Sequence, residues 1–333
     1  MPWVRAAGIW RLSRRTAQDG SDAIWRPFYD STIRYERIVL SEVRCLSRSP
    51  TYAEFLLLEP PLLFAHRADT SMKAKLDITD IAIAGHAQNI TLRSFNPSAH
   101  SGAPIVLYFH GGGFVKGSLS EASKPASLIA ARVPAWVIAV GYSLAPEFPF
   151  PAATEDAHLA LEWAVKNARE FRVDSNRIAA VGHDAGGNIA AGLAAIARDR
   201  GVRRLSAQAL LAPMLDPSMT RLIDGNRSRK SDLAPEDCAR SYRAYLPLAA
   251  QRIHPYAAPL ESRRLGTLPP TLIATAEQDL VRADGETYAR ELITAGVPVE
   301  MTRHAGVCHG ELISHTPALN DVVEFLRKRL ASD

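Results

Sequence analysis

From residue 103 to the end of the chain, short and wholly apolar runs alternate with segments of helical periodicity. The runs are "APIVLYFH", "AWVIAVGYS", "RIAAVGH", "AQALLAP" and "PPTLIATAE", followed by the weaker "VPVEMTRHAG". A strand that is apolar along its whole length is typical of a parallel sheet covered on both faces. Helical patterns such as "EDAHLALEWAVKNAREF" and "GGNIAAGLAAIARDR" supply the crossovers that parallel strands need. The sequence therefore predicts an α/β fold with a mostly parallel central sheet flanked by helices.

Two segments depart from this rhythm. Residues 1–75 contain helix-like patterns and the proline-broken piece "LLLEPPLLF", and residues 214–257 are long, polar and rich in arginine. Between the first segment and the apolar runs, "DITDIAIAGHAQNITLRSFNP" alternates as half-buried strands do. With 47% apolar residues among 333, the chain has enough apolar side chains for a large core. The stretch 214–257 is expected to be an insertion over one end of the sheet.

Charge and cysteine content argue against several classes of function. The net charge is +4 and the pI about 9.0, but no dense basic run with interleaved aromatic residues occurs, so nucleic-acid binding is not expected. Cys45, Cys238 and Cys308 are widely spaced and form no C-x-x-C motif, which disfavours a disulfide framework or a zinc site. No apolar run approaches the length of a membrane span. We expect a cytoplasmic protein with a small-molecule partner and no stable membrane insertion; the sequence leaves a homodimer open.

The stretch "VGHDAGGNIA", residues 181–190, has the outline of a nucleophile elbow. "RIAAV" is an apolar strand, Gly182 to Gly186 form the turn, and "GNIAAGLAAIARDR" is helical in pattern, which is the strand-turn-helix order that such an elbow requires. The position at which G-x-S-x-G has its serine is occupied by Asp184. The elbow therefore predicts a catalytic position at residue 184 and leaves its chemistry open.

A second motif, His110-Gly111-Gly112-Gly113, follows directly after "IVLYF". Glycines allow backbone geometry closed to other residues and leave N–H groups uncovered. Such N–H groups stabilise a developing oxyanion, often with a large effect on rate. The N–H of Ala185, just after the elbow, stands where a further oxyanion donor is expected.

An acid and a histidine follow two later strands. Asp279 comes after "TLIATA", and His309 comes shortly after the strand-like "VEMTR". Because ligands of an open parallel sheet bind at the carboxyl ends of its strands, these side chains and the elbow are expected at one edge. The order elbow, acid, histidine is that of the α/β-hydrolases. The residues that compete for the two roles are Asp284 and Glu277 for the acid, and His304 and His315 for the histidine.

Together these segments resemble the hormone-sensitive-lipase-like branch of the α/β-hydrolases, which includes microbial carboxylesterases and arylacetamide deacetylase. The matching segments are "HGGGFVKGS", "YSLAPEFPFPAATEDA", "DSNRIAAVGHDAGGNIA", "APMLD", "LGTLPPTLIATAEQD" and "AGVPVEMTRHAGVCHGE", in family order and at family spacing. The resemblance implies an α/β-hydrolase fold in a single domain over residues 1–333. It also implies a helical cap formed by about 1–75 and about 214–257, and neither cofactor nor metal.

The resemblance further implies roles for single residues. Asp279 is similar to the acid that orients the catalytic histidine, His309 is similar to that histidine, and the residues similar to the oxyanion hole are Gly112, Gly113 and Ala185. The chain departs from the family at the elbow, which is typically G-D-S-A-G-G, because Asp184 replaces the serine. Leu280 also stands in place of a proline, and Glu311 in place of an aromatic residue.

An aspartate in this position is compatible with catalysis. A carboxylate is ionised near pH 7 and needs no base to act as a nucleophile. Epoxide hydrolases and haloalkane dehalogenases, on the same fold, use an aspartate, and "GHDAGG" resembles the epoxide hydrolase elbow G-H-D-W-G. Asp184 would form a covalent ester that water activated by His309 hydrolyses. The expected substrate is a small, mostly apolar ester or epoxide-like molecule.

The alternative is a catalytically inactive protein that uses the same pocket to bind a ligand. Asp184 could enter the oxyanion hole itself and block it, and two carboxylates around His309 would favour a protonated imidazole, which is no base. Opening an epoxide also requires a proton donor, often a tyrosine. The tyrosines in cap-like segments are Tyr29, Tyr35, Tyr52, Tyr242 and Tyr245.

Overall fold

The computed structural model describes residues 76–97, 101–201, 204–222 and 231–332. These residues belong to a compact unit that runs from Arg67 to Asp333. The expected cap segment 1–75, with Tyr29, Tyr35 and Tyr52, lies outside the described residues. The single domain over 1–333 with a two-part cap therefore stays a prediction.

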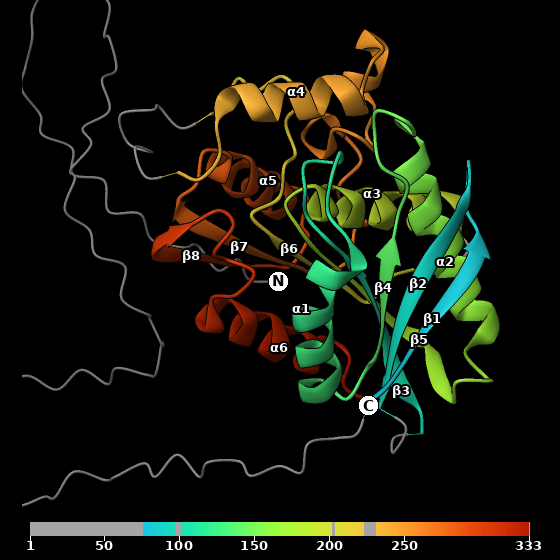
Figure 1. Cartoon of the computed structure of the whole chain (residues 1–333). Helices are drawn as coiled ribbons and strands as arrows, with labels where there is room; N and C mark the ends of the chain where they lie inside the picture. The colour runs from blue at the N-terminus through green and yellow to red at the C-terminus, as the bar shows by residue number, and fades with distance from the viewer. Residues whose placement is uncertain (1–75, 98–100, 202–203, 223–230, 333) are drawn as a thin grey trace, which may run out of the picture. The chain divides into compact units, whose positions relative to one another are not determined.

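Eight strands form one central sheet. They are β1 Leu76–Ala84, β2 Asn89–Pro97, β3 Ala103–Phe109, β4 Trp136–Gly141, β5 Val173–His183, β6 Ala207–Leu211, β7 Thr271–Gln278 and β8 Val299–Cys308. Their order across the sheet is β1-β2-β4-β3-β5-β6-β7-β8 (Figure 1). β2 pairs antiparallel with β1 and β4, whereas all pairings from β4 to β8 are parallel. The mostly parallel sheet predicted from the apolar runs is confirmed.

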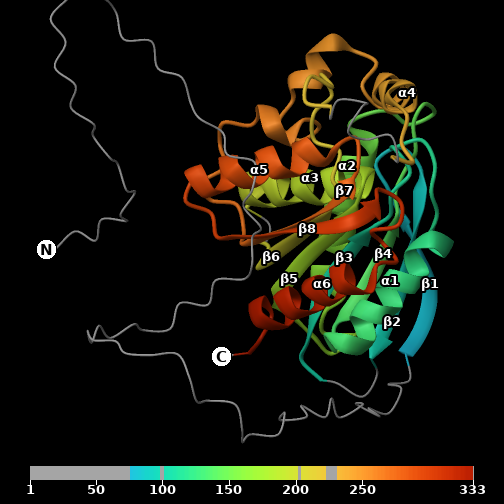
Figure 2. The ribbon, with the colours of Figure 1, turned by 90° about the vertical axis from the view of Figure 1, so that its left-hand side faces the viewer.

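Helices cover both faces of this sheet. They are α1 Leu119–Arg132, α2 Ala152–Asn167, α3 Ala185–Arg200, α4 Pro235–Tyr245, α5 Arg282–Thr294 and α6 Thr316–Arg329, with short 3-10 helices η1 Ala249–Ile253 and η2 Pro259–Glu261. Figures 1 and 2 show α2, α3 and α5 on one face and α1 and α6 on the other. Each face holds its own cluster of buried apolar side chains. β3 is buried along its whole length because both layers cover it.

The helix that follows the elbow is buried nearly all round. Every residue of α3 from Ala185 to Ala197 is buried, and most of them are alanine or glycine. Small side chains let the sheet and neighbouring segments approach closely; a Cβ on Gly192 would lie 2.7 Å from the carbonyl oxygen of Tyr256. Close packing on several sides fixes the position of the turn from which α3 starts.

Two helices are not revealed by the sequence patterns. Pro125 lies in the interior of α1, where a proline usually interrupts a helix, but it is buried beside Ala126 and Ile129 and packs on the sheet. α4 lies in the polar stretch 214–257, and its apolar stripe consists of the buried Cys238, Tyr242 and Tyr245. These three residues are spaced four and three apart, as on one face of an amphipathic helix. Three apolar positions are too few for the pattern to be recognised within the surrounding polar sequence.

Candidate active site

The turn between β5 and α3 holds Asp184 in a strained conformation. Its φ of 57° and ψ of −121° are rarely adopted by a residue with a side chain. Strand and helix meet so closely that a Cβ on Gly182 would lie 2.0 Å from the carbonyl oxygen of Gly186. A Cβ on Gly186 would lie 2.2 Å from the carbonyl oxygen of Phe109. The glycines of the motif are therefore required by packing, and the turn has the sharp geometry of a nucleophile elbow.

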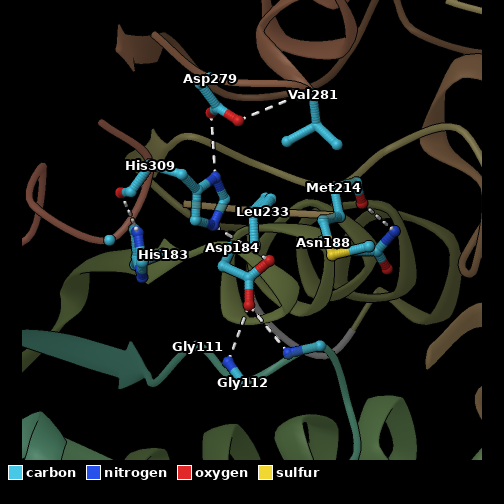
Figure 3. A network of polar contacts seen from close by, with 12 residues as sticks. Gly111, Gly112, His183, Asp184, Asn188, Met214, Leu233, Asp279, Val281 and His309 are labelled. Atoms are coloured by element: carbon cyan, nitrogen blue, oxygen red, sulfur yellow. Dashed lines mark hydrogen bonds and ion pairs between the residues drawn. The ribbon is translucent and has the colours of Figure 1, made fainter. Parts of the chain in front are cut away.

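Asp184, Asp279 and His309 meet at the carboxyl edge of the sheet (Figure 3). Asp184 follows β5, Asp279 follows β7 and His309 follows β8. His309 Nδ1 lies 2.9 Å from Asp279 Oδ2, and His309 Nε2 lies 3.4 Å from Asp184 Oδ1. All three side chains are buried. The imidazole thus stands between two carboxylates, hydrogen-bonded to one and in ionic contact with the other.

The competing candidates are engaged elsewhere. Asp284 accepts two backbone N–H groups from the loop after β6, and burial raises its pKa to about 7. His304 lies 3.5 Å from Asp321 on α6, and the His315 ring packs edge-on against it. Glu277 accepts a backbone N–H from the β8 segment. Of the candidates weighed in the sequence, Asp279 and His309 are the acid and the histidine that contact each other.

The Asp184 carboxylate occupies the glycine loop. Its Oδ2 accepts the N–H groups of Gly112 and Gly113 at 2.7 and 2.8 Å (Figure 3). Among the described contacts, no hydrogen bond joins the Ala185 N–H to this carboxylate. Two of the three expected oxyanion donors are therefore already directed at a negative charge, and that charge belongs to the protein.

The charges at this edge stabilise one another. Burial would raise the pKa of Asp184, but contact with His309, the nearby His183 and the Gly112 N–H hold it well below its ordinary value. Burial would lower the pKa of His309, but Asp279 and Asp184 raise it well above its ordinary value. Near pH 7 the resting site therefore holds an imidazolium between two carboxylates.

Two residues that sequence reasoning did not assign to the site hold the backbone of His309. His183 Nε2 lies 3.2 Å from the His309 carbonyl oxygen (Figure 3). Burial, and then the charge of His309, lower the pKa of His183 to about 4, so its ring is neutral near pH 7. On the other side, Asp232 accepts the N–H groups of His309 and Gly310. No motif signals these contacts, since the partners are 126 and 77 residues apart in sequence from His309.

A cavity of about 650 Å³ opens over these residues. Its floor includes Asp184 and His309, and Met214 and Leu233 form apolar walls next to the Asp184 carboxylate (Figure 3). The α4 residues that line it are Asp237, Cys238, Arg240, Ser241 and Ala244. Described residues of the stretch 214–257 therefore line one side of this pocket.

No tyrosine lines this cavity within the described residues. Tyr242 and Tyr245 belong to the apolar core, where both rings pack against Phe114. The proton donor that epoxide opening calls for is therefore not supplied by either of these α4 tyrosines. Cys238 reaches the cavity, but burial raises the pKa of its thiol to about 12, which keeps it from acting as a nucleophile.

In the part of the chain that the structure describes, no three histidine, cysteine or acidic residues are grouped so as to hold a metal ion. None of the helices in that part is long and apolar enough to cross a membrane.

Residues 106–313, well over half of the chain, match a family model described as alpha/beta hydrolase fold. The chain belongs to the α/β-hydrolase family. This α/β-hydrolase is 38% identical over 244 residues to esterase LipI of Mycobacterium tuberculosis, covering 71% of this chain and 75% of that protein. It is 33% identical over 267 residues to ethyl acetate hydrolase of Pseudomonas putida, covering 76% of this chain and 83% of that protein.

Solved structures agree with this assignment. EstE1, a thermophilic carboxylesterase cloned from a metagenomic library, matches with a TM-score of 0.73 at 32% identity, covering 77% of this chain and 90% of that one. A hyperthermophilic esterase from Pyrobaculum calidifontis matches with a TM-score of 0.71 at 35% identity, over 77% of this chain and 87% of that one. The predicted fold is confirmed, as is the hormone-sensitive-lipase-like branch of the α/β-hydrolases.

The pairing of His309 with two carboxylates predicts a fall in the free energy of unfolding as pH rises above about 6.5. Because the folded pKa of His309 is raised, its stabilising contribution is complete below the unfolded pKa and is lost as pH rises through the folded pKa. The slope from this one group is at most about 1.4 kcal/mol per pH unit. Asp184, with a lowered pKa, contributes above about pH 4 and loses its contribution only at stronger acidity.

Urea unfolding between about pH 6 and pH 9 tests this pairing. We expect Asp184→Asn to show the shallower fall, because its imidazolium keeps only Asp279 as an anionic partner. Other groups titrate in both proteins, so their contributions cancel in the difference. Identical slopes would show that Asp184 does not hold the proton on His309.

Proposed function

We propose that this α/β-hydrolase cleaves a small, mostly apolar ester or epoxide-like substrate through a covalent intermediate on Asp184. The observation that carries the proposal is the unequal environment of the two carboxylate oxygens. Oδ2 accepts the N–H groups of Gly112 and Gly113, whereas Oδ1 is buried without a hydrogen-bond partner among the described residues and faces His309 at 3.4 Å. An ionised oxygen with a free lone pair, next to a pocket, is suited to attack carbon.

In the first step, Oδ1 attacks the electrophilic carbon and the bond from that carbon to the leaving oxygen breaks. The enzyme is then joined to the substrate as an ester, or as an anhydride when the attacked atom is an acyl carbon. When the attacked atom is an acyl carbon, His309, protonated in the resting site, gives its proton to the leaving oxygen, directly or through water. No base is required before this step, since Asp184 is already ionised.

The second step depends on the charge that the first step removes. Once Asp184 is acylated or alkylated, Asp279 is the one carboxylate left beside His309, so the imidazole holds a proton less strongly and can take one from water. The water oxygen bonds to Asp184 Cγ, and the negative charge develops on Oδ2. That oxygen already lies between the Gly112 and Gly113 N–H groups, which stabilise it. Breaking the Cγ–Oδ1 bond releases the product with Oδ1 and leaves the water oxygen on Asp184.

The pocket and the relatives both support the proposed substrate class. Met214 and Leu233 next to Asp184 favour an apolar group at the reacting carbon. Relatives named as an esterase and as an ethyl acetate hydrolase support small esters. Neither step calls for a cofactor or metal. An ester is favoured over an epoxide by the described residues because no tyrosine donor lines the cavity within them.

A second candidate function is ligand binding without turnover. It is favoured by the same carboxylate, since Asp184 satisfies two oxyanion donors and neutralises the imidazolium. Such a site is a stable resting arrangement in which the Gly112 and Gly113 N–H groups are already bonded to the protein's own carboxylate.

Turnover of a panel of p-nitrophenyl esters and small epoxides separates the two functions. We expect the unsubstituted protein to hydrolyse members of one class, and Asp184→Asn, which keeps the shape but lacks the charged nucleophile, to be slower by about 10³-fold or more. A protein that binds panel members yet releases no product from any of them would support the binding function and contradict the proposal.

A further inference from the structure

The carboxylate of Asp232 bridges two consecutive backbone N–H groups at the catalytic histidine. Oδ1 accepts the N–H of His309 at 3.0 Å, and Oδ2 accepts the N–H of Gly310 at 2.8 Å. The space is tight, because a Cβ on Gly310 would lie 2.7 Å from Oδ2 of Asp232. Both carboxylate oxygens are therefore used, and each is bonded to backbone of the segment that carries the imidazole.

The His309 residue is thus held at three points. Asp279 binds its Nδ1, His183 contacts its carbonyl oxygen and Asp232 accepts its N–H. The hydrogen bond to Asp279 fixes one ring atom but leaves the ring free to swing about it. The two backbone contacts remove that freedom by fixing the Cα from which the ring projects. Since Nε2 is the atom that faces Asp184, its placement depends on this backbone.

Asp232 also belongs to the pocket wall. It lines the cavity together with its neighbour Leu233, and α4 begins three residues further along the chain. The hydrogen bond from the His309 N–H to Asp232 therefore connects the lining of the pocket to the backbone of the proposed base.

We propose that Asp232 is a positioning residue, which acts through the backbone of His309 to hold Nε2 in line with Asp184 and the attacking water. The proposal rests on the function proposed above for the catalytic step. The effect of Asp232 on the position of the His309 imidazole can be measured without turnover. Misplacing a reacting group by about 1 Å costs on the order of 100-fold in rate, so a bond of this kind is expected to act on kcat.

The first test is the proton resonance of the His309 Nδ1–H that is bonded to Asp279, measured by NMR on the full chain. We expect this downfield signal to broaden or shift in Asp232→Ala, because the ring samples other orientations. Asp232→Asn retains one acceptor oxygen, so its Nδ1–H signal should be intermediate between those of the unsubstituted protein and Asp232→Ala. The matched control is Asp174→Ala, which removes another carboxylate that accepts a backbone N–H, from Asn176, and pairs with Arg177 far along the chain from His309.

The second test is kinetic, on whichever p-nitrophenyl ester the protein hydrolyses. Asp232→Ala is expected to lower kcat on the order of 100-fold with little change in KM, and Asp232→Asn to recover part of the loss. Asp174→Ala should lower the melting temperature without either effect. An Nδ1–H resonance unchanged by Asp232→Ala overturns the positioning role, as does an unchanged kcat. If the protein proves inert, the catalytic proposal fails, and the NMR signal still decides whether Asp232 positions the ring.

Discussion

Replacing His309 with glutamine is expected to stop the reaction after its first step. The Gly112 and Gly113 N–H groups still bind the Asp184 carboxylate in this variant, so attack on a p-nitrophenyl ester, whose leaving group is stable as an anion, proceeds without the imidazole. Water addition then lacks its general base and slows by about 10²- to 10⁴-fold. The enzyme should release one equivalent of nitrophenol rapidly and then turn over very slowly.

Intact-mass measurement of His309→Gln checks this expectation. The protein mass should rise by that of the acyl group, and fragmentation should place the addition on the peptide that contains Asp184. The double variant Asp184→Asn/His309→Gln serves as the control and should gain no mass. A burst without a mass increase, or an addition elsewhere such as on Cys238 or Ser241, would contradict a covalent intermediate on Asp184.

Asp184→Ser is expected to produce an ordinary serine esterase. The elbow geometry, the glycine loop, Asp279 and His309 are all in place, and removal of the carboxylate frees the Gly112 and Gly113 N–H groups for the substrate oxyanion. The pKa of His309 should fall as it loses one anionic partner, which restores the neutral base that serine requires. Relative to Asp184→Asn, hydrolysis of p-nitrophenyl acetate should rise on the order of 10³-fold.

The serine variant also separates the two candidate functions. If Asp184→Ser is active and the unsubstituted protein is active, the elbow supports both nucleophiles. If only Asp184→Ser is active, the natural side chain blocks a working scaffold, and the ligand-binding function replaces the catalytic one. Double substitution with His309→Gln should abolish the gained activity, because serine, unlike aspartate, cannot attack without a base.

The sequence predicts the sheet well because its signals are local. The apolar runs that become β3, β4, β5, β6 and β7 each report burial on both faces, and the glycines around Asp184 report the close approach of strand and helix. The order of elbow, acid and histidine brings the three side chains to one edge because parallel strands end there. By contrast, α1 is not predicted, because Pro125 argues against a helix there. The packing of this buried proline, which compensates for the lost backbone hydrogen bond, cannot be inferred from the sequence.

Contacts between residues far apart in the sequence could not be predicted in this way. Nothing in the stretch around Asp232 signals that its carboxylate reaches the backbone of His309, and nothing around His183 signals its contact with the same residue. The sequence allows the hypothesis that Asp184 enters the glycine loop. It does not predict which carboxylate oxygen accepts the Gly112 and Gly113 N–H groups and which one faces His309. This difference between the two oxygens carries the proposed mechanism, and three-dimensional structure is needed to find it.

A single turnover in heavy-oxygen water shows whether water attacks Asp184 itself or the substrate. With enzyme in excess over substrate, we expect one heavy oxygen to appear in the peptide containing Asp184, while the first-turnover product carries the light oxygen that was Oδ1. His309→Gln should slow this labelling together with turnover. If the heavy oxygen appears in the product while Asp184 remains light, water does not attack Asp184 Cγ, and the second step proposed above is refuted.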